Sequence, residues 1–195
     1  MTSRTTLVAV SAKLVKYRPR YLPVASCRRA AVLVPLRVLA GTVTPGSDPE
    51  LELILTRRSA DLAKHSGQVA FPGGAIDAAD PTPEDTALRE AFEELGLGRN
   101  YVRVLGRLDD VLSNTGFHCV PVVGLVAPEA TLKANPAEVA RIFSVPLADL
   151  AVRERWELRP IVEAGRPHEL PHFFADGEDI WGLTATVLLR LAELL

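Results

Sequence analysis

The hydrophobic and polar positions of the chain follow strand patterns in some stretches and helix patterns in others. Near-continuous apolar runs with β-branched residues are typical of buried strands, whereas apolar steps of three and four residues are typical of amphipathic helices. These patterns predict strands at 29–39, 51–56, 68–71, 102–112, 118–126, 138–145, 153–162 and 171–175. They predict helices at 6–17, 83–95 and 180–195. Mixed strands with a central and a C-terminal helix indicate an α/β fold, in which a mixed sheet is sandwiched between helices.

The central helix is the best defined of these elements. Thr82 is a suitable N-cap, Pro83 suits the first helical position, and Gly96 is a natural C-terminal stop. One side of the helix carries apolar residues at steps of three and four, so we expect this side to be buried against the sheet. The residues of this predicted stripe are Leu88, Ala91, Phe92 and Leu95.

Three carboxylates crowd the last turns of the same helix. Glu90 and Glu94 share one face, and Glu93 lies beside them, within reach of Arg89. The carboxylates repel one another, and the negative end of the helix disfavours them further. A solvated helix face commonly explains such a pair, but here a Gly-rich turn at 71–74 precedes the helix. Because glycine lets a backbone carbonyl approach an ion closely, the combination favours an oxygen-liganded site for Mg²⁺ or Mn²⁺.

These residues resemble the signature of a known superfamily. Gly74, Asp80 and the run 89–97 (REAFEELGL) resemble the Nudix box of hydrolases that cleave nucleoside diphosphates linked to another group. The upstream runs 55–59 (LTRRS) and 67–74 (GQVAFPGG) resemble the extra signature of its coenzyme A pyrophosphatase branch. The spacing from the glycine to the run is one residue longer than usual, and Asp80 stands where the box usually has Glu. The resemblance implies a Nudix-like α/β/α sandwich and metal-dependent hydrolysis of a pyrophosphate.

The expected site follows from this resemblance and from the chemistry of the carboxylates. We expect Glu90 and Glu94 to be the main ligands of Mg²⁺ or Mn²⁺, with Glu93 and the carbonyl of Gly74 completing the coordination sphere. Either Glu90 or Glu93 would act as general base, and the sequence leaves that choice open. Arg89 is expected to orient Glu93 through an ion pair.

Arginines and glycines are the expected substrate-binding residues. Arg57 and Arg58 follow the predicted strand 51–56, and a guanidinium can bind a phosphate through two hydrogen bonds. Arg58 is the better candidate of the two, because it belongs to the resemblance. Gly73 and Gly74 are expected to let the backbone approach the substrate.

The resemblance implies that the substrate is coenzyme A or a derivative, which would be split into 3′,5′-ADP and 4′-phosphopantetheine. A relative that acts on ADP-ribose, NADH or another nucleoside diphosphate derivative is the alternative, because Ala63 stands where the branch signature often has Arg. A non-catalytic module that senses a nucleotide is a second alternative. Such a module would be expected to lose the carboxylates, and all three are present here.

Composition and charge exclude several other classes. A chain of 195 residues suffices for one domain with a substantial core. Its net charge of −2 gives no indication that it binds nucleic acid. No apolar run approaches the length that spans a membrane. Cys27 and Cys119 form neither a metal-ligand spacing nor a disulfide framework, which fits a reducing cytosol. We therefore expect a cytoplasmic protein with a small-molecule substrate and with neither a nucleic-acid nor a membrane partner, and the sequence is compatible with a homodimer.

The N-terminal stretch is basic and contains no acidic residue before Asp48. A mitochondrial transit peptide would also be basic and acid-free, but Pro19 and Pro23 interrupt this stretch. We therefore expect a genuine N-terminal arm over 1–28, followed by a single Nudix hydrolase domain over 29–195. The arm could bind a polyanionic ligand by charge, or it could pack on the fold or on a second subunit.

Overall fold

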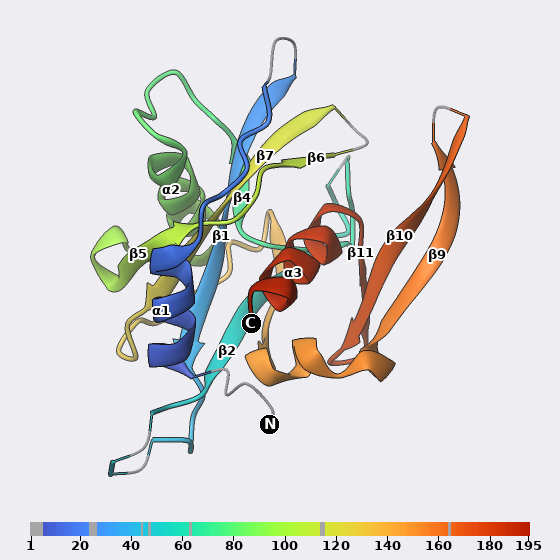
Figure 1. Cartoon of the computed structure of the whole chain (residues 1–195). Helices are drawn as coiled ribbons and strands as arrows, with labels where there is room; N and C mark the ends of the chain where they lie inside the picture. Colours follow the sequence, from blue (N-terminus) through green and yellow to red (C-terminus); the bar gives the residue numbers. More distant parts are fainter. Residues whose placement is uncertain are drawn as a thin grey trace.

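A mixed β-sheet with helices on both faces forms the body of the protein (Figure 1). The computed structural model describes residues 6–23, 27–43, 45–46, 48–62, 64–113, 116–163 and 165–195. The elements in chain order are α1 (Leu7–Lys16), β1 (Arg28–Val38), β2 (Leu51–Arg58), β3 (Val69–Ala70), β4 (Gly73–Ala75), α2 (Pro83–Leu95), β5 (Val102–Arg107), β6 (Val111–Leu112), β7 (Phe117–Val126), β8 (Val139–Pro146), β9 (Trp156–Glu163), β10 (Arg166–Ala175), β11 (Glu178–Trp181) and α3 (Gly182–Leu194). Short 3₁₀ helices lie at Arg99–Tyr101, Leu147–Ala151 and Arg153–Arg155.

The sheet is built around the parallel pair of β1 and β7. Their register runs from Arg28 opposite Phe117 to Leu36 opposite Leu125. β2 pairs antiparallel with β1, and β5 pairs antiparallel with β7, so the order is β3-β2-β1-β7-β5, with β4 on β1, β6 on β7 and β8 on β2. Because helices cover both faces, the central strands are apolar on both sides, which explains their near-continuous hydrophobic runs. The predicted mixed sheet of an α/β/α sandwich is confirmed.

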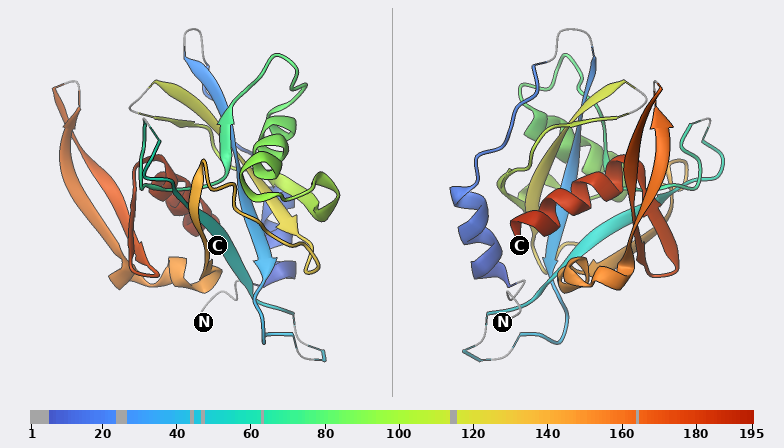
Figure 2. Two further views of the ribbon diagram at one scale, coloured as in Figure 1. Left: turned by 180° about the vertical axis from the view of Figure 1, so that it is seen from behind. Right: turned by 45° about the vertical axis from the view of Figure 1, so that its right-hand side comes forward.

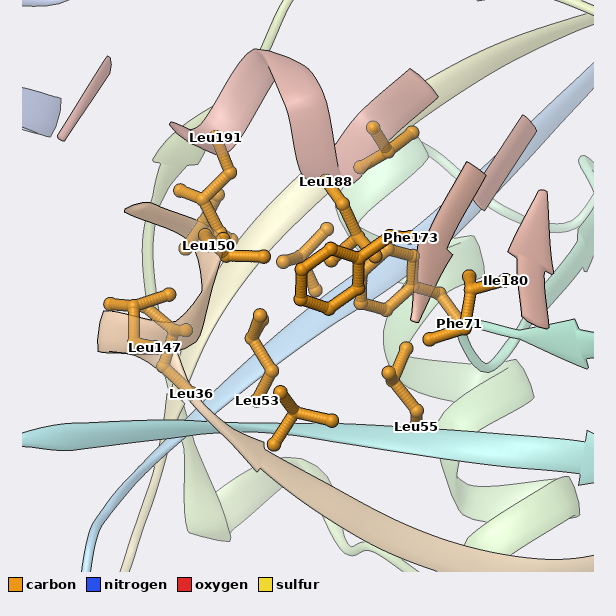
Figure 3. Packing of buried hydrophobic residues seen from close by; sticks show 14 of the residues in the cluster. Leu36, Leu53, Leu55, Phe71, Leu147, Leu150, Phe173, Ile180, Leu188 and Leu191 are labelled. Carbon is orange, nitrogen blue, oxygen red and sulfur yellow. The ribbon is translucent and has the colours of Figure 1, made fainter. Parts of the chain in front are cut away.

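One face of the sheet packs against α1 and α3. Val10 of α1 and Leu188 and Leu191 of α3 belong to one buried cluster with the inner side chains of β2. Figure 3 shows the centre of this cluster, with Phe71, Phe173 and Leu55 among its labelled side chains. The side chain of Phe173 is fully buried. The N-terminal helix, the sheet and the C-terminal helix therefore share one hydrophobic core.

Helix α2 covers the opposite face of the sheet (Figure 2). It begins as predicted, because the Thr82 hydroxyl accepts a hydrogen bond from the Asp85 N–H, and it ends at Gly96, whose φ of 65° is left-handed. The prediction that Phe92 is buried was wrong, since 60% of its surface is exposed. The sheet contacts the side of α2 around Ala91, and Phe92 lies about 100° further around the helix, so it faces solvent.

The structure also corrects several element boundaries: β9 begins at Trp156 rather than at residue 153, and β10 begins at Arg166 rather than at residue 171. The single strand expected over 102–112 is divided into β5 and β6, because the intervening Asp109 and Asp110 bind the N-terminal segment instead of the sheet. The Tyr17 hydroxyl and the Arg20 N–H donate to Asp109, at 2.7 and 2.9 Å. The closing helix begins at Gly182 rather than at residue 180, because β11 pairs with β10 up to Trp181.

β9, β10 and β11 form a second, three-stranded antiparallel sheet. Its β9–β10 hairpin extends away from the body of the molecule (Figures 1 and 2). The base of this hairpin is anchored in the core, where the rings of Phe173 and Trp156 pack at a centroid distance of 4.7 Å with their planes tilted by 46°. Across the described ranges, none of the helices is both long and apolar enough to cross a membrane.

Replacing Phe173 with alanine should lower the free energy of unfolding by about 3–5 kcal/mol, because it leaves a cavity in the shared core. Phe92→Ala is the matched control and should cost less than about 1 kcal/mol, because that ring is mostly exposed. Urea denaturation of both variants measures the difference. Equal losses would contradict the assignment of Phe92 to the surface.

Candidate active site

The described acidic side chains of the candidate site meet where α2 passes over β4 and the end of β2. Glu94 lies in the last turn of α2 and is only 2% exposed, which is unusual for a carboxylate. The backbone of Gly73 in β4 lies close enough to lower the pKa of this carboxylate. Arg58, at the end of β2, places its Nη1 atom 4.0 Å from Glu94 Oε1. Three elements that are distant in sequence thus converge on one buried carboxylate.

The two glycines of β4 make this approach possible. β4 pairs with β1, with Gly73 opposite Val32 and Gly74 opposite Ala31. A Cβ atom on Gly73 would lie 2.5 Å from the Ala31 carbonyl oxygen, and one on Gly74 would lie 2.5 Å from Cδ of Glu90. Neither position tolerates a side chain without a shift of its neighbours. At Gly73 the neighbour is backbone, so glycine is required for close packing. At Gly74 the neighbour is the Glu90 side chain, so the Gly74 backbone lies against the Glu90 carboxylate.

Burial and mutual repulsion disfavour the charged form of these carboxylates. Burial raises the pKa of Glu94 to about 8; Arg58 opposes this rise, whereas Glu138 and Glu90 add to it. Burial also raises the pKa of Glu90, and Arg89 opposes that rise. When all of these carboxyls are ionised, they carry more negative charge than Arg58 and Arg89 balance. A bound divalent cation would offset this excess, and the oxygen donors are of the type that Mg²⁺ and Mn²⁺ prefer.

Arg89 holds the outer carboxylates in place. Its Nη1 atom lies 2.9 Å from Glu90 and 3.1 Å from Glu93, and its Nη2 atom lies 3.0 Å from Asp80. These contacts raise the pKa of Arg89 above its already high value and lower the pKa of Asp80. The ion pair expected between Arg89 and Glu93 is therefore present. The structure adds Asp80, which fixes the guanidinium from the other side and also accepts a hydrogen bond from Thr86 at 2.9 Å.

The proposed metal ligands are gathered only in part. Glu90 and Glu94 lie together with the Gly74 backbone, whereas the Glu93 side chain is 49% exposed and is bound to Arg89. Within the described ranges, no three acidic, histidine or cysteine side chains form a ready metal cluster. The donor set nevertheless fits a hard divalent cation, because the carboxylates of Glu90 and Glu94 and the nearby Gly74 backbone offer oxygen ligands.

The two neighbouring arginines point to opposite faces of β2, since side chains alternate along a strand. Arg58 lies on the face of α2, beside Glu94, whereas Arg57 forms an ion pair with Glu178 of β11 at 3.2 Å. Half of the Arg57 side chain is exposed. The Nε atom of Arg58 is buried and has no hydrogen-bond partner in the described part of the chain. Only Arg58 therefore joins the carboxylates.

Glu138 is a member of the site that the sequence did not reveal. Its charge raises the pKa values of both Glu90 and Glu94, so it lies close to both. The Asn135 amide donates to the Glu138 carboxylate at 3.3 Å, and the Ser59 N–H donates to its carbonyl at 2.8 Å. No local pattern marks this residue. The pairing of β8 with β2, which no sequence motif encodes, brings it to the site.

Comparisons with known proteins agree with this fold. The family described as NUDIX domain matches residues 35–164. A relative from Photorhabdus laumondii subsp. laumondii, named as the uncharacterized Nudix hydrolase NudL, is 42% identical over 166 residues, which cover 85% of this chain and 84% of that protein. The uncharacterized Nudix hydrolase NudL of Yersinia pestis is 41% identical over 169 residues, which cover 87% of this chain and 80% of that protein.

Solved structures give the same result. A Nudix hydrolase from M. smegmatis, RenU, aligns with a TM-score of 0.51 and 25% identity over 64% of this chain and 74% of that one. A MutT/nudix family protein from Enterococcus faecalis aligns with a TM-score of 0.51 over 95% of this chain and 68% of that one, and its 15% identity supports the fold alone. The extent of the family match and the identity to the curated relatives show that this chain belongs to the NUDIX domain family and is a Nudix hydrolase.

Proposed function

We propose that this Nudix hydrolase cleaves the pyrophosphate bond of coenzyme A or one of its derivatives, releasing 3′,5′-ADP and 4′-phosphopantetheine. The observation that carries the reaction class is the buried Glu94 carboxylate, which lies beside Glu90, the Gly74 backbone and Arg58. Carboxylates that can bind a cation and a guanidinium that can bind a phosphate thus lie next to each other. This arrangement supports hydrolysis of a phosphate anhydride.

The choice of coenzyme A rests on the runs 55–59 and 67–74, and their arrangement supports it. β2 pairs with β3, so that Thr56 lies opposite Ala70, and the Arg58 N–H donates to the Gln68 carbonyl at 2.9 Å. The two runs that carry the resemblance to the coenzyme A branch therefore lie side by side, next to Glu94. ADP-ribose or NADH is the alternative substrate, which rests on Ala63, a residue outside the described ranges.

The proposed mechanism assigns a role to each side chain. Glu90 and Glu94, together with Glu93 and the Gly74 carbonyl, would hold Mg²⁺ or Mn²⁺, which when bound supplies charge neutralisation at the phosphate oxygens and lowers the pKa of a bound water. Arg58 binds a phosphate oxygen. Either Glu90 or Glu93 accepts the proton of the attacking water.

Arg89 and Glu138 act on these residues rather than on the substrate. Arg89 fixes the orientation of both base candidates, because its Nη1 atom contacts Glu90 and Glu93 at once. Glu138 adds negative charge next to Glu94 and thereby favours cation binding. Its hydrogen bond from Asn135 holds it at the entrance to β8.

Product analysis tests the substrate. The protein is incubated with Mg²⁺ and, separately, with coenzyme A, ADP-ribose and NADH, and the products are separated by chromatography. We expect 3′,5′-ADP from coenzyme A, with a kcat/KM at least about tenfold above those for the other two substrates, which corresponds to about 1.4 kcal/mol of transition-state discrimination. A preference for ADP-ribose or NADH would keep the reaction class and reject the proposed substrate.

Replacing Glu94 with glutamine tests the metal ligand. The amide keeps the size of the side chain but loses the charge that holds the cation, so kcat with Mg²⁺ should fall by at least about 100-fold. Glu129→Gln is the matched control, because Glu129 is exposed and far from α2 in sequence, and it should retain full activity. Near-normal turnover of the Glu94 variant at ordinary Mg²⁺ concentrations would remove Glu94 from the ligand set.

The raised pKa of Glu94 predicts a pH-dependent stability in metal-free protein. The carboxyl titrates near 4.3 in the unfolded chain and at about 8 in the folded one, so the stability it provides when protonated is present below pH 4.3 and is lost as the pH rises towards 8. At pH 8 with a chelator, Glu94→Gln should therefore be more stable than the wild type by at least about 1 kcal/mol, or about 2–4 °C in Tm.

Calorimetry at pH 5 and pH 8 measures this effect, and the difference between variant and wild type should shrink at the lower pH. Adding Mg²⁺ at pH 8 should stabilise the wild type more than the variant, because only the wild type retains the charge that binds the cation. A variant that is less stable than the wild type at pH 8 without metal would contradict the cost assigned to burying this carboxylate.

A further inference from the structure

The loop that joins β2 to β3 carries a histidine in an uncommon backbone conformation. His65 has a φ of 56°, in the left-handed region that few residues other than glycine adopt. Its Nδ1 atom lies 3.0 Å from Oε1 of Gln68, and the residue is exposed. A conformation of this kind is unfavourable by itself, so it persists only where the surrounding structure holds it.

Hydrogen bonds hold this loop beside the catalytic residues. At its base, the Arg58 N–H donates to the Gln68 carbonyl at 2.9 Å, and the Ser59 N–H donates to the Glu138 carbonyl at 2.8 Å. The Ser66 hydroxyl donates at 2.7 Å to a carbonyl on the other side of the loop. The loop is therefore fixed at both ends to strands that carry residues of the site.

The pairing of β2 with β3 determines the face on which the histidine lies. Arg57 lies opposite Val69, and the hydrogen bond between the next two residues places Arg58 opposite Gln68. Residues directly opposite each other on antiparallel strands point to the same face of a sheet, with their Cβ atoms about 5 Å apart. Val69 packs in the cluster on the other face, with α3, as this alternation requires. The Gln68 side chain therefore lies on the face of Arg58 and Glu94, and it holds the histidine ring there.

The hydrogen bond to Gln68 determines which ring nitrogen a ligand meets. An amide oxygen only accepts, so Nδ1 of His65 carries a proton. Nε2 has no hydrogen-bond partner in the described part of the chain, and the exposure of the residue leaves it accessible. When the ring is protonated, both nitrogens donate. An anion at this face thus finds a second donor next to Arg58.

We propose that His65 binds a phosphate oxygen of the substrate's diphosphate group through Nε2, beside the oxygen that Arg58 binds. A phosphate only accepts, so it binds the protonated ring, and its negative charge favours that form. Arg58 shares its charge with Glu94, whereas His65 has no acidic partner within the described ranges. The inference rests on the proposed reaction class but not on the choice of coenzyme A, because ADP-ribose and NADH contain the same diphosphate.

Calorimetric titration of the full chain with Mg²⁺ and α,β-methylene-ADP tests the contact, because the methylene bridge of this diphosphate cannot be hydrolysed. In His65→Asn the backbone conformation is retained, since asparagine adopts a positive φ more readily than most residues, but the imidazole is lost. This variant should bind the analogue at least about tenfold more weakly than the wild type. His168→Asn is the matched control and should change the affinity less than about twofold, because His168 is exposed on β10 of the second sheet.

Gln68→Ala tests whether Gln68 positions the ring. The variant keeps the backbone carbonyl that binds Arg58 and loses only the side chain that holds His65. It should weaken binding of the analogue by about three- to tenfold in the wild type and by less than about twofold in the His65→Asn background, because it acts through the ring. Additive losses in the double variant would contradict this role.

A second measurement needs no substitution. In ¹⁵N-detected NMR of the wild type, the analogue should move the ring-nitrogen signals of His65 towards those of a charged imidazolium. An unchanged affinity in His65→Asn, or a ring that stays neutral in the complex, would overturn the assignment and leave the proposed function intact. If the wild type did not bind the analogue, both would be overturned. Weaker binding in His65→Asn, without hydrolysis of coenzyme A, ADP-ribose or NADH by the wild type, would support the assignment and reject the proposed function alone.

Discussion

The active-site region depends on the burial of the Glu94 carboxylate. Burial at this depth raises the pKa of Glu94 to about 8, and Arg58, 4.0 Å away, and the backbone of Gly73 only partly oppose that rise. The Gly73 contact requires β4 to pack closely on β1, and a side chain at Gly73 would prevent that packing because its Cβ would lie 2.5 Å from the Ala31 carbonyl oxygen. The remaining imbalance of charge makes this place attractive for a cation, so the same burial that weakens the metal-free fold favours metal binding.

Arg89 shows how one cation organises several anions without neutralising the buried one. It contacts Glu90 and Glu93 of α2 and Asp80 in the loop before this helix. The outer carboxylates are thereby oriented and their repulsion is reduced, whereas Glu94 depends on Arg58 alone among the described cations that influence it. The two arginines thus serve different carboxylates: Arg89 contacts Glu90 and Glu93, and Arg58 lies beside Glu94.

The N-terminal segment is also part of this architecture. Asp109 and Asp110 interrupt the strand between β5 and β6 and bind the chain from Tyr17 to Leu22. This contact balances part of the basic charge of the segment, because Arg20 forms an ion pair with Asp109. The acidic pair and the basic segment are separated by almost ninety residues in sequence, yet they meet at the edge of the sheet.

The sequence by itself determined the elements whose signals are local: the cap and stop of α2, the apolar runs of β1 and β7, and the carboxylates that carry the family signature. Periodicity and capping depend on neighbouring residues, so they can be read without the fold. Only the tertiary structure decided that Phe92 is exposed, that Arg57 and Arg58 lie on opposite faces of β2 beside different partners, and that Glu138 joins the site. These outcomes depend on which strands pair and which side of a helix meets the sheet, and such long-range contacts leave no pattern in the local sequence.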